Sequence, residues 1–439
     1  MARTAGSAET TGPTTTTGPT TGPAKMTLGR DERLLFATRA VRMFGYGLAS
    51  VVLVLYLAAL GLPNPAIGLL LTLTLLGDAA ISLWLTTHAD RVGRRRVLFA
   101  GALLMCMAGV GFASTSALPV LILAATIGVI SPSGNEVGPF LAVEQAALSQ
   151  TVADRARTRV FAWFNLTGSF ATATGALVGG GVAGALIAAG RAPVDAYRVV
   201  IVIYAFLGLL LAALFWRVSP RVEVAEPPDA SIARRLGLHR SRGVIARLSA
   251  IFALDAFGGG LVVQSLVAYW FHLRFGADVA VLGAVFFVAN LLAGISALAA
   301  VWIADRIGLV RTMVFTHLPS NILLAMVPLM PTLPLAVIVL LARFSISQMD
   351  VPTRQSYTMS VVDPDERSAA AGVTGIARSL GASISPLLAA PLYGVASLAA
   401  LPFLLAGALK IGYDVALYRG FRSIRPEHEQ PNSGARPTP

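Results

Sequence analysis

The sequence predicts an all-α membrane protein with twelve transmembrane helices in two pseudo-symmetric six-helix halves. Three observations lead to this prediction: the composition, a loop sequence that occurs twice, and the number of long apolar segments. Hydrophobic residues make up 55% of the 439 residues and charged residues 13%, whereas soluble domains contain about 25% charged residues. The mean hydropathy is +0.72, and a chain of this length accommodates about twelve helices of ~20 residues with short loops.

A basic loop occurs twice, at positions about half the chain apart. Residues 89–96 read Ala-Asp-Arg-Val-Gly-Arg-Arg-Arg, and residues 304–311 read Ala-Asp-Arg-Ile-Gly-Leu-Val-Arg. Each copy lies between two apolar segments, and charged residues, among them three consecutive arginines in the first copy, are not tolerated in hydrocarbon. Each copy is therefore predicted to be a tight polar loop between two spanning helices. Repetition at half the chain length indicates a duplicated membrane unit.

This pair of loops resembles the loop signature of the major facilitator superfamily, and the resemblance covers about residues 33–418. It implies a transporter whose helices 1, 4, 7 and 10 line a central path, with the loop charges holding the halves closed on one side. By this resemblance the gate residues are Asp90, Arg91, Gly93, Arg94, Arg95, Asp305 and Arg306. The structural alternative is an anchoring loop with a helix-capping aspartate. The antiporter signature of the family is incomplete, because Ala176 stands where it has proline.

Apolar length and the positions of glycine and proline place the helices in order. The first six are expected at about 33–60, 65–88, 96–114, 118–150, 158–188 and 194–216. The second six are expected at about 248–275, 279–304, 310–329, 333–361, 367–395 and 398–418. The predicted domains are a disordered tail (1–29), an N-terminal half (30–217), a connector (218–247), a C-terminal half (248–418) and a second tail (419–439).

The net charge of +12 has its basic residues in loops beside apolar segments, which indicates membrane orientation and not nucleic-acid binding. Nearly all loop arginines fall on one side, so we expect a plasma-membrane protein with both termini in the cytoplasm. We also expect a monomer in the bilayer. Cys106 is the single cysteine, which excludes an intrachain disulfide and a thiolate cluster. No metal, cofactor or enzymatic activity is predicted, because no nucleotide-binding loop or nucleophile elbow is present.

Ionisable residues inside apolar segments mark a transport path, because each is costly unless it is paired or hydrated. The candidates for the substrate and proton path are Arg42, Asp78, Asn135, Glu136, Asp255, Arg343, Gln348, Asp350 and Arg378. Glu136 lies in a segment, 131–139, with two prolines and two glycines, which is predicted to interrupt the fourth helix beside a cavity. Glu136 and Arg343 are expected at the same depth of pseudo-equivalent helices and to approach each other in one access state.

Either Glu136 or Asp78 could carry a coupling proton, and a purely structural ion pair at Glu136 is the alternative. Lys410 and Asp414 are spaced i,i+4 and are expected to pair on one helix. For four ionisable residues near helix ends, an ion pair between the halves and a transport role are both open alternatives: Arg39, Glu144, Asp255 and Arg354.

The sequence therefore predicts secondary active transport of a small solute by alternating access, with proton-coupled efflux. One alternative is uptake or facilitated diffusion of a metabolite or anion, which the arginines of the first helix favour. A remote alternative is a membrane receptor that transports nothing. The identity of the substrate does not follow from the residues.

Overall fold

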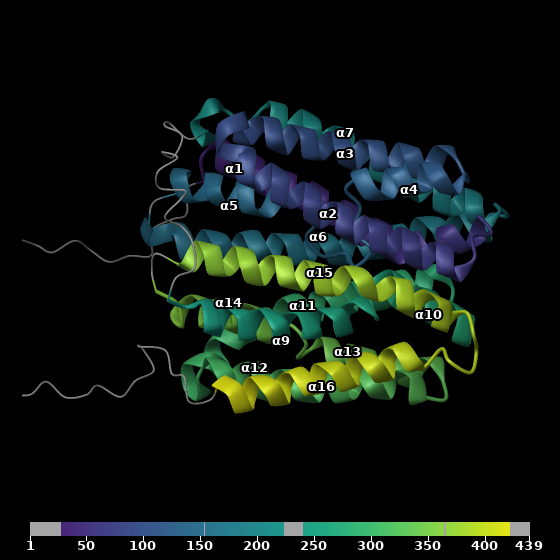
Figure 1. Cartoon of the computed structure of the whole chain (residues 1–439). Helices are drawn as coiled ribbons and strands as arrows, with labels where there is room; N and C mark the ends of the chain where they lie inside the picture. The colour runs from purple at the N-terminus through teal and green to yellow at the C-terminus, as the bar shows by residue number, and fades with distance from the viewer. Residues whose placement is uncertain (1–27, 153, 224–239, 364–365, 422–439) are drawn as a thin grey trace, which may run out of the picture.

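The computed structural model describes residues 28–152, 154–223, 240–363 and 366–421, which form an elongated bundle of helices (Figure 1). The N-terminal half contains α1 (Arg30–Ala59), α2 (Asn64–Val92), α3 (Arg94–Ser114), α4 (Leu118–Ile127), α5 (Phe140–Thr151), α6 (Asp154–Ala188) and α7 (Pro193–Trp216). The short helix η1 (Pro220–Val222) follows. The predicted disorder of the N-terminal tail and most of the predicted connector fall outside the described residues.

The C-terminal half contains α9 (Arg242–Gly260), α10 (Gln264–Phe275), α11 (Val279–Ile307), α12 (Leu309–Met326), η2 (Val327–Leu329), α13 (Leu333–Phe344), α14 (Asp350–Ser360), α15 (Arg367–Tyr393) and α16 (Leu401–Phe421). Among the described residues, ten helical segments are long and apolar enough to cross a membrane, with α9 and α10 counted together. The pairs α4–α5 and α13–α14 make the other two crossings. The predicted twelve-helix membrane fold is confirmed.

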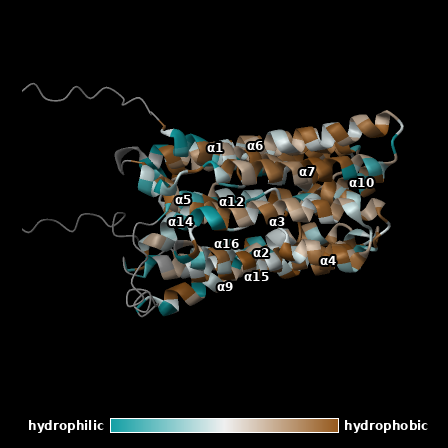
Figure 2. Ribbon diagram, turned by 90° about the horizontal axis from the view of Figure 1, so that it is seen from above, coloured by the Kyte–Doolittle hydropathy of each residue, from teal (hydrophilic) through white to brown (hydrophobic). Residues whose placement is uncertain are grey.

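Three crossings are each divided into two; the interruption of the fourth was predicted, whereas the seventh and tenth were expected to be continuous. The fourth is interrupted between Ile127 and Phe140, the seventh between Gly260 and Gln264, and the tenth between Phe344 and Asp350. An interruption within hydrocarbon is tolerated only where protein or water contacts the free backbone groups. Hydrophobic residues cover the length of the bundle, and hydrophilic residues gather toward the end that carries α5 and α14 (Figure 2).

In each basic loop a single glycine separates the two helices, Gly93 between α2 and α3 and Gly308 between α11 and α12. Gly93 has φ +104° and Gly308 has φ +85°, a region that disfavours residues with a Cβ atom. Because α2 ends at Val92 and α3 begins at Arg94, the chain reverses at Gly93 alone, as the prediction of a tight loop required. We call the side of this loop the basic side. The described ends of the chain, at the start of α1 and the end of α16, also lie there (Figure 1).

The two halves pack through α2 against α15 and through α6 against α11. The hydrogen bonds that join the halves among the described residues lie at mid-depth or toward the side opposite the basic side. Tyr269 Oη donates to Asn64 Oδ1 over 3.1 Å, and the backbone N–H of Leu387 donates to Thr72 Oγ1 over 3.0 Å. In this conformation the halves are therefore joined on the opposite side.

Small residues permit this close approach. A Cβ atom at Gly180 on α6 would lie 2.5 Å from the carbonyl oxygen of Val279 and 2.7 Å from the Cα of Gly283 on α11. Neither backbone atom can move independently of α11, so a side chain at Gly180 separates the halves. Gly181 is the natural comparison, because nothing lies within 4 Å of a Cβ atom there.

We expect Gly180→Val to open the opposite side of the bundle. Overpacking costs about 1–3 kcal/mol, which corresponds to roughly tenfold more of the open state. The measurement uses a Cys106→Ser background with Ser265→Cys, which is buried at this interface. A membrane-impermeant maleimide added from the opposite side should label the Gly180→Val protein about tenfold faster. Gly181→Val should label like the parent, and equal labelling of all three proteins would contradict the role of Gly180.

Candidate functional site

The gate residues predicted from the twin loops lie at the basic ends of α2, α3 and α11. Asp90 lies on α2, but its side chain is outside the described part of the structure. Arg94 is buried, and its Nη1 donates to the carbonyl of Val222 over 3.3 Å. In the second copy Asp305 is exposed, and the Arg306 guanidinium carbon lies 3.3 Å from the centroid of the Trp302 ring. The two copies thus have different surroundings.

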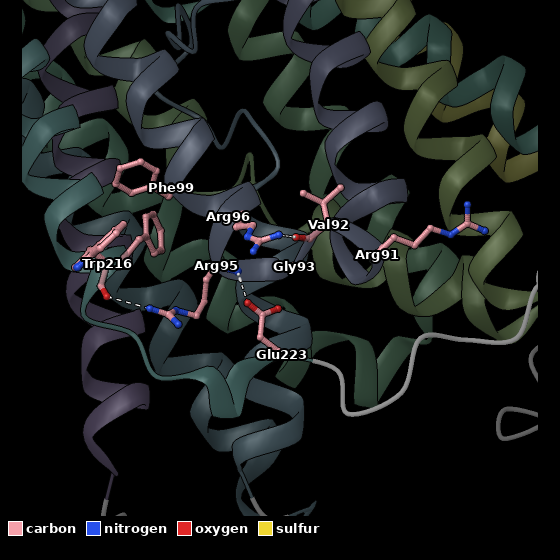
Figure 3. A pocket seen from close by; sticks show the side chains of 9 residues that line it. Arg91, Val92, Gly93, Arg95, Arg96, Phe99, Trp216 and Glu223 are labelled. Carbon is pink, nitrogen blue, oxygen red and sulfur yellow. Dashed lines mark hydrogen bonds between the residues drawn. The ribbon is translucent and has the colours of Figure 1, made fainter.

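Glu223, which follows η1, was not predicted to contribute to this loop. Its Oε2 accepts the backbone N–H of Arg94 over 2.6 Å and its Oε1 that of Arg95 over 3.1 Å (Figure 3). A carboxylate at a helix N-terminus satisfies free N–H groups and favours the helix dipole. Glu223 therefore caps α3 and fixes the start of the connector against the first basic loop.

The interruption of the fourth crossing results from its glycines and prolines. Gly134 has φ +70° and Gly138 has φ +81°, while Pro132 and Pro139 cannot donate backbone hydrogen bonds. The interruption leaves carbonyl groups without helical hydrogen-bond donors, and side chains of neighbouring helices donate to them instead. Tyr46 Oη donates to the carbonyl of Val137 over 3.0 Å, and Tyr204 Oη donates to that of Val129 over 2.6 Å.

Asp78 also serves this interruption. Its Oδ1 accepts the backbone N–H of Gly138 over 2.6 Å and the hydroxyl of Ser82 over 3.3 Å. Asp78 on α2 therefore holds the segment that carries Glu136. Asn135 is exposed although it lies at mid-depth in the fourth crossing.

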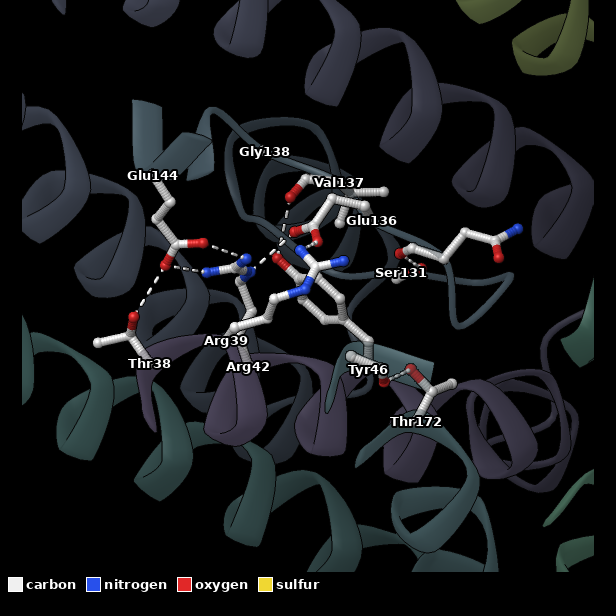
Figure 4. Close-up of polar contacts among 12 residues, drawn as sticks. Thr38, Arg39, Arg42, Tyr46, Ser131, Glu136, Val137, Gly138, Glu144 and Thr172 are labelled. Carbon is white, nitrogen blue, oxygen red and sulfur yellow. Dashed lines mark hydrogen bonds and ion pairs between the residues drawn. The ribbon is translucent and has the colours of Figure 1, made fainter. Parts of the chain in front are cut away.

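The first charge cluster joins α1 to the interrupted fourth crossing (Figure 4). Arg39 Nη1 lies 2.7 Å from Glu136 Oε2, and Arg42 Nε lies 2.8 Å from Glu136 Oε1. Arg42 also donates from Nη1 and Nη2 to both oxygens of Glu144 over 2.8 Å. The Arg42 and Glu144 side chains are fully buried, whereas the Glu136 side chain is 16% exposed. Two arginines balance two glutamates, so these four side chains form a neutral unit with one partly accessible carboxylate.

The second charge cluster lies in the C-terminal half around Asp255 on α9. Lys410 Nζ on α16 lies 2.6 Å from Asp255 Oδ1. Arg378 Nη1 and Arg354 Nη1 lie 3.2 Å and 3.5 Å from Asp255 Oδ2. Arg354 Nη1 also lies 2.5 Å from Asp350 Oδ2. One carboxylate is thus shared by three basic side chains from three other helices.

A buried histidine that the sequence did not single out connects this cluster to α12. His317 Nδ1 lies 2.8 Å from Asp414 Oδ1, and its Nε2 lies 3.8 Å from Asp255 Oδ1. Asn321 Nδ2 donates to the other oxygen of Asp414 over 2.9 Å. His317 and Asn321 are four residues apart, so the sequence alone could have placed them on the same face of the ninth crossing. No other feature of the sequence pointed to His317.

One predicted pairing is wrong, and one of two alternatives that were left open, ion pairs between the halves, does not occur among the described residues in this conformation. Lys410 does not pair with Asp414 on its own helix, because packing of α9 against α16 brings Asp255 within 2.6 Å of Lys410 Nζ. The ion pairs of Arg39, Glu144, Asp255 and Arg354 also form within their own halves and not between the halves. A partner on an adjacent helix of the same half is nearer than any across the bundle.

The remaining predicted path residues lie apart from Glu136. Arg343, at the end of α13, interacts electrostatically with Asp255 and Asp350, so in this conformation it belongs to the second cluster. Its Nε atom is buried and has no hydrogen-bond partner among the described residues. The backbone N–H of Gln348 donates to Ser296 Oγ over 3.1 Å, which supports the interruption of the tenth crossing.

The two clusters are related by the repeat, with their charges exchanged. In the first half the base is on α1 (Arg42) and the acid on α5 (Glu144); in the second half the acid is on α9 (Asp255) and the base on α14 (Arg354). The first crossing corresponds to the seventh, and the fourth to the tenth. The duplication has therefore preserved the positions of the ion pair and reversed its polarity.

A line of polar side chains crosses between the halves at mid-depth. Gln264 Nε2, at the start of α10, donates to Ser50 Oγ on α1 over 2.7 Å. Asn290 Nδ2 on α11 donates to Gln264 Oε1 over 3.2 Å, and the N–H of Ser265 donates to the carbonyl of Pro132 over 3.1 Å. Hydrogen-bonding groups from both halves thus meet beside the interrupted crossings.

A duplicated bundle of twelve crossings with interrupted helices and buried charges at mid-depth is the architecture of a membrane transporter. The family model described as Major Facilitator Superfamily matches residues 35–386. The chain belongs to the Major Facilitator Superfamily, as the twin loops suggested.

Similar proteins agree with this assignment. The chain is 30% identical over 388 residues to the uncharacterized membrane protein YJR124C of Saccharomyces cerevisiae, covering 82% of this chain and 87% of that protein. Among solved structures, a D-xylose-proton symporter aligns with a TM-score of 0.68 at 17% identity, covering 91% of this chain and 98% of that one. The nucleoside transporter NupG aligns with a TM-score of 0.66 at 15% identity, covering 90% and 99%. The human organic anion transporter MFSD10 aligns with a TM-score of 0.59 at 17% identity, covering 88% and 99%.

Proposed function

We propose that this protein is a secondary active transporter that exports a small solute in exchange for protons. The observation that carries the proposal is the first charge cluster, in which Glu136 is the partly exposed member of an otherwise buried group of ion pairs. Buried charge inside a membrane is costly and is retained where it serves ion or substrate movement. Glu136 also lies on the segment that breaks the fourth crossing, where backbone and side chains are available to a ligand.

Charge balance gives a route to coupling. The cluster is neutral while Glu136 is ionised, because Arg39 and Arg42 face Glu136 and Glu144. Protonation of Glu136 removes one negative charge and leaves the two arginines with one carboxylate. The arginines would then favour a different geometry or a different anion, and either change links proton binding to the conformation of the path. Asp78 acts in this proposal as the support of the Glu136 segment.

The proposed direction is export from the cytoplasm. The support for this direction is that the halves are joined on the side opposite the arginine-rich loops. The distribution of positive charge assigns the arginine-rich side to the cytoplasm and the joined side to the exterior. The site would then load from the cytoplasm in this conformation. The gate role of Asp90 and its basic neighbours belongs to the same proposal: they would close the basic side when the halves rock.

The second candidate substrate class is an organic anion. In the second cluster, four basic side chains (Arg343, Arg354, Arg378 and Lys410) interact with two carboxylates, Asp255 and Asp350, while Asp414 is bonded to His317 and Asn321. The Arg378 side chain is 33% exposed, so this surplus of positive charge is open to a negatively charged solute. The first cluster offers no such surplus, because its arginines are neutralised.

The test is a flux measurement on the full chain in proteoliposomes. The panel contains radiolabelled nucleosides, pentoses and monocarboxylates, each assayed with and without an imposed pH difference. Proton-coupled export predicts that one class accumulates against its gradient when the pH difference is present. A protonophore should abolish accumulation and leave exchange intact. Equilibration that is the same with and without the pH difference would favour facilitated diffusion. Absence of flux for every class in the panel would count against the proposed transport.

A further inference from the structure

A pocket opens on the basic side, between the end of α2, the start of α3 and the end of α7. Its volume is about 560 Å³, and its lining includes Arg91, Arg95, Arg96, Phe99, Trp216 and Glu223. Figure 3 shows Arg95 and Arg96 between Trp216 and Gly93, with Arg91 extending on the far side of Val92. The pocket is separate from both charge clusters, and the transport proposal gives it no ligand.

The pocket lies at the level where a spanning helix meets lipid headgroups. Val92 ends α2, Arg94 begins α3 and Trp216 ends α7, so three crossings terminate around it. The Trp216 side chain is 71% exposed, and its ring centroid lies 5.8 Å from that of Phe99. Exposed tryptophan at a helix end is typical of the membrane–water interface. One wall of the pocket is therefore aromatic and faces the bilayer.

The opposite wall is basic, because three arginines (Arg91, Arg95 and Arg96) outnumber the single carboxylate of Glu223. Both Glu223 oxygens accept backbone N–H groups of α3. The described hydrogen bonds of the Arg95 and Arg96 guanidinium groups go to carbonyl oxygens instead, those of Trp216 over 3.2 Å and Val92 over 3.4 Å. The buried Arg95 Nε has no hydrogen-bond partner among the described residues. The exposed Arg91 and Arg96 side chains therefore retain N–H donors for a phosphate group.

We propose that this pocket binds the headgroup phosphate of an anionic phospholipid from the leaflet on the basic side. The arginines would contact the phosphate, and Trp216 and Phe99 would pack against the glycerol and the first part of the acyl chains. Because the pocket is built on the first basic loop, a bound lipid would hold α2, α3 and α7 together at the proposed gate. A soluble phosphate compound offers the same anion but lacks the acyl chains that the aromatic wall would contact.

The proposal can be tested by fluorescence quenching of Trp216 in the purified full chain in detergent. The probes are phosphatidylglycerol and phosphatidylcholine with brominated acyl chains. The contribution of Trp216 is the part of the quenching that Trp216→Phe removes. We expect this part to appear at lower concentrations of phosphatidylglycerol than of phosphatidylcholine. Arg96→Gln should weaken the phosphatidylglycerol effect about fivefold, because one basic residue near an anionic surface contributes about 1 kcal/mol.

The matched control is Arg198→Gln, which removes a partly exposed arginine near the start of α7, at the opposite side, and should leave the quenching unchanged. Arg96 is exposed, so its replacement should also leave thermal unfolding without lipid unchanged. Equal quenching by the two lipids, or an unchanged effect in Arg96→Gln, would overturn the proposal. Displacement of the lipid by millimolar glycerol phosphate or inorganic phosphate would identify a soluble phosphate site instead. None of these outcomes depends on transport.

Discussion

Glu136→Gln is expected to abolish accumulation driven by a pH difference while substrate exchange continues. Glutamine keeps the size of the side chain, and its one amide oxygen can still accept a hydrogen bond from Arg39 or Arg42, which bond to different oxygens of Glu136 over 2.7 Å and 2.8 Å. It cannot gain or lose a proton, so the step that links the proton gradient to the path is removed. The measurement compares accumulation under an imposed pH difference with gradient-free exchange in the same vesicles.

Two control variants are needed to interpret this result. Asp195→Asn removes a carboxylate that is paired with Arg198 near the surface, and it should transport like the parent. Asp78→Asn tests the competing proton carrier; its amide can still accept the N–H of Gly138, so we expect accumulation to persist. If Glu136→Gln concentrates substrate as well as the parent, Glu136 is structural. Loss of accumulation in Asp78→Asn alone would transfer the coupling role to Asp78.

Arg42→Met is expected to be the most destabilising single change in the first cluster. Arg42 is fully buried and bonded to both Glu136 and Glu144. Its removal leaves the fully buried Glu144 without its guanidinium partner, and breaking a buried ion pair on one side costs about 3–5 kcal/mol. The variant should show a lower thermal unfolding midpoint in detergent and a lower yield of folded protein.

The partner substitution separates this cause from loss of packing. In Arg42→Met/Glu144→Gln the buried carboxylate is also gone, and Glu136 retains Arg39 at 2.7 Å, so most of the lost stability should return. Arg198→Met is the control for loss of an arginine from a partly exposed ion pair, which contributes about 0–1 kcal/mol. No recovery in the double variant would mean that Arg42 stabilises the bundle by packing, for example against the Phe140 ring 4.6 Å away.

The sequence selected the candidate path residues but not their partners, and the difference has a geometric reason. Glu136, Arg42, Asp255 and Arg378 could be selected because each ionisable group interrupts an apolar segment. Which of them meet depends on how helices far apart in sequence pack: α9 lies against both α15 and α16, which brings Arg378 and Lys410 to Asp255. The i,i+4 spacing of Lys410 and Asp414 predicted an ion pair between them. This spacing rule considers one helix only and takes no account of residues on neighbouring helices.

The exchange of acid and base between the ion pairs of the two halves was also only partly visible in the sequence. Glu144 and Arg354 are 210 residues apart, close to the offset of the twin loops, so the exchange of acid and base on the fourth and tenth crossings was visible in the sequence. The matching exchange of Arg42 and Asp255 on the first and seventh crossings becomes apparent only when both ion pairs are formed. His317 was missed because its i,i+4 spacing to Asn321 is a weak signal until the fold brings Asp255 and Asp414 to its two nitrogens.

What the sequence determined by itself is the membrane class, the duplication, the twelve crossings and the tight basic loops. These follow from local properties: apolar length, the exclusion of arginine from hydrocarbon, and the conformational freedom of Gly93 and Gly308. The tertiary structure alone decided how the interrupted crossings are stabilised, because Tyr46, Asp78 and Tyr204 reach them from other helices. It also decided that the ion pairs form within each half, and that α2, α3 and α7 end around a basic pocket. A hydrogen bond or an ion pair requires atoms within about 3–4 Å, and only the packing of the helices brings distant residues that close.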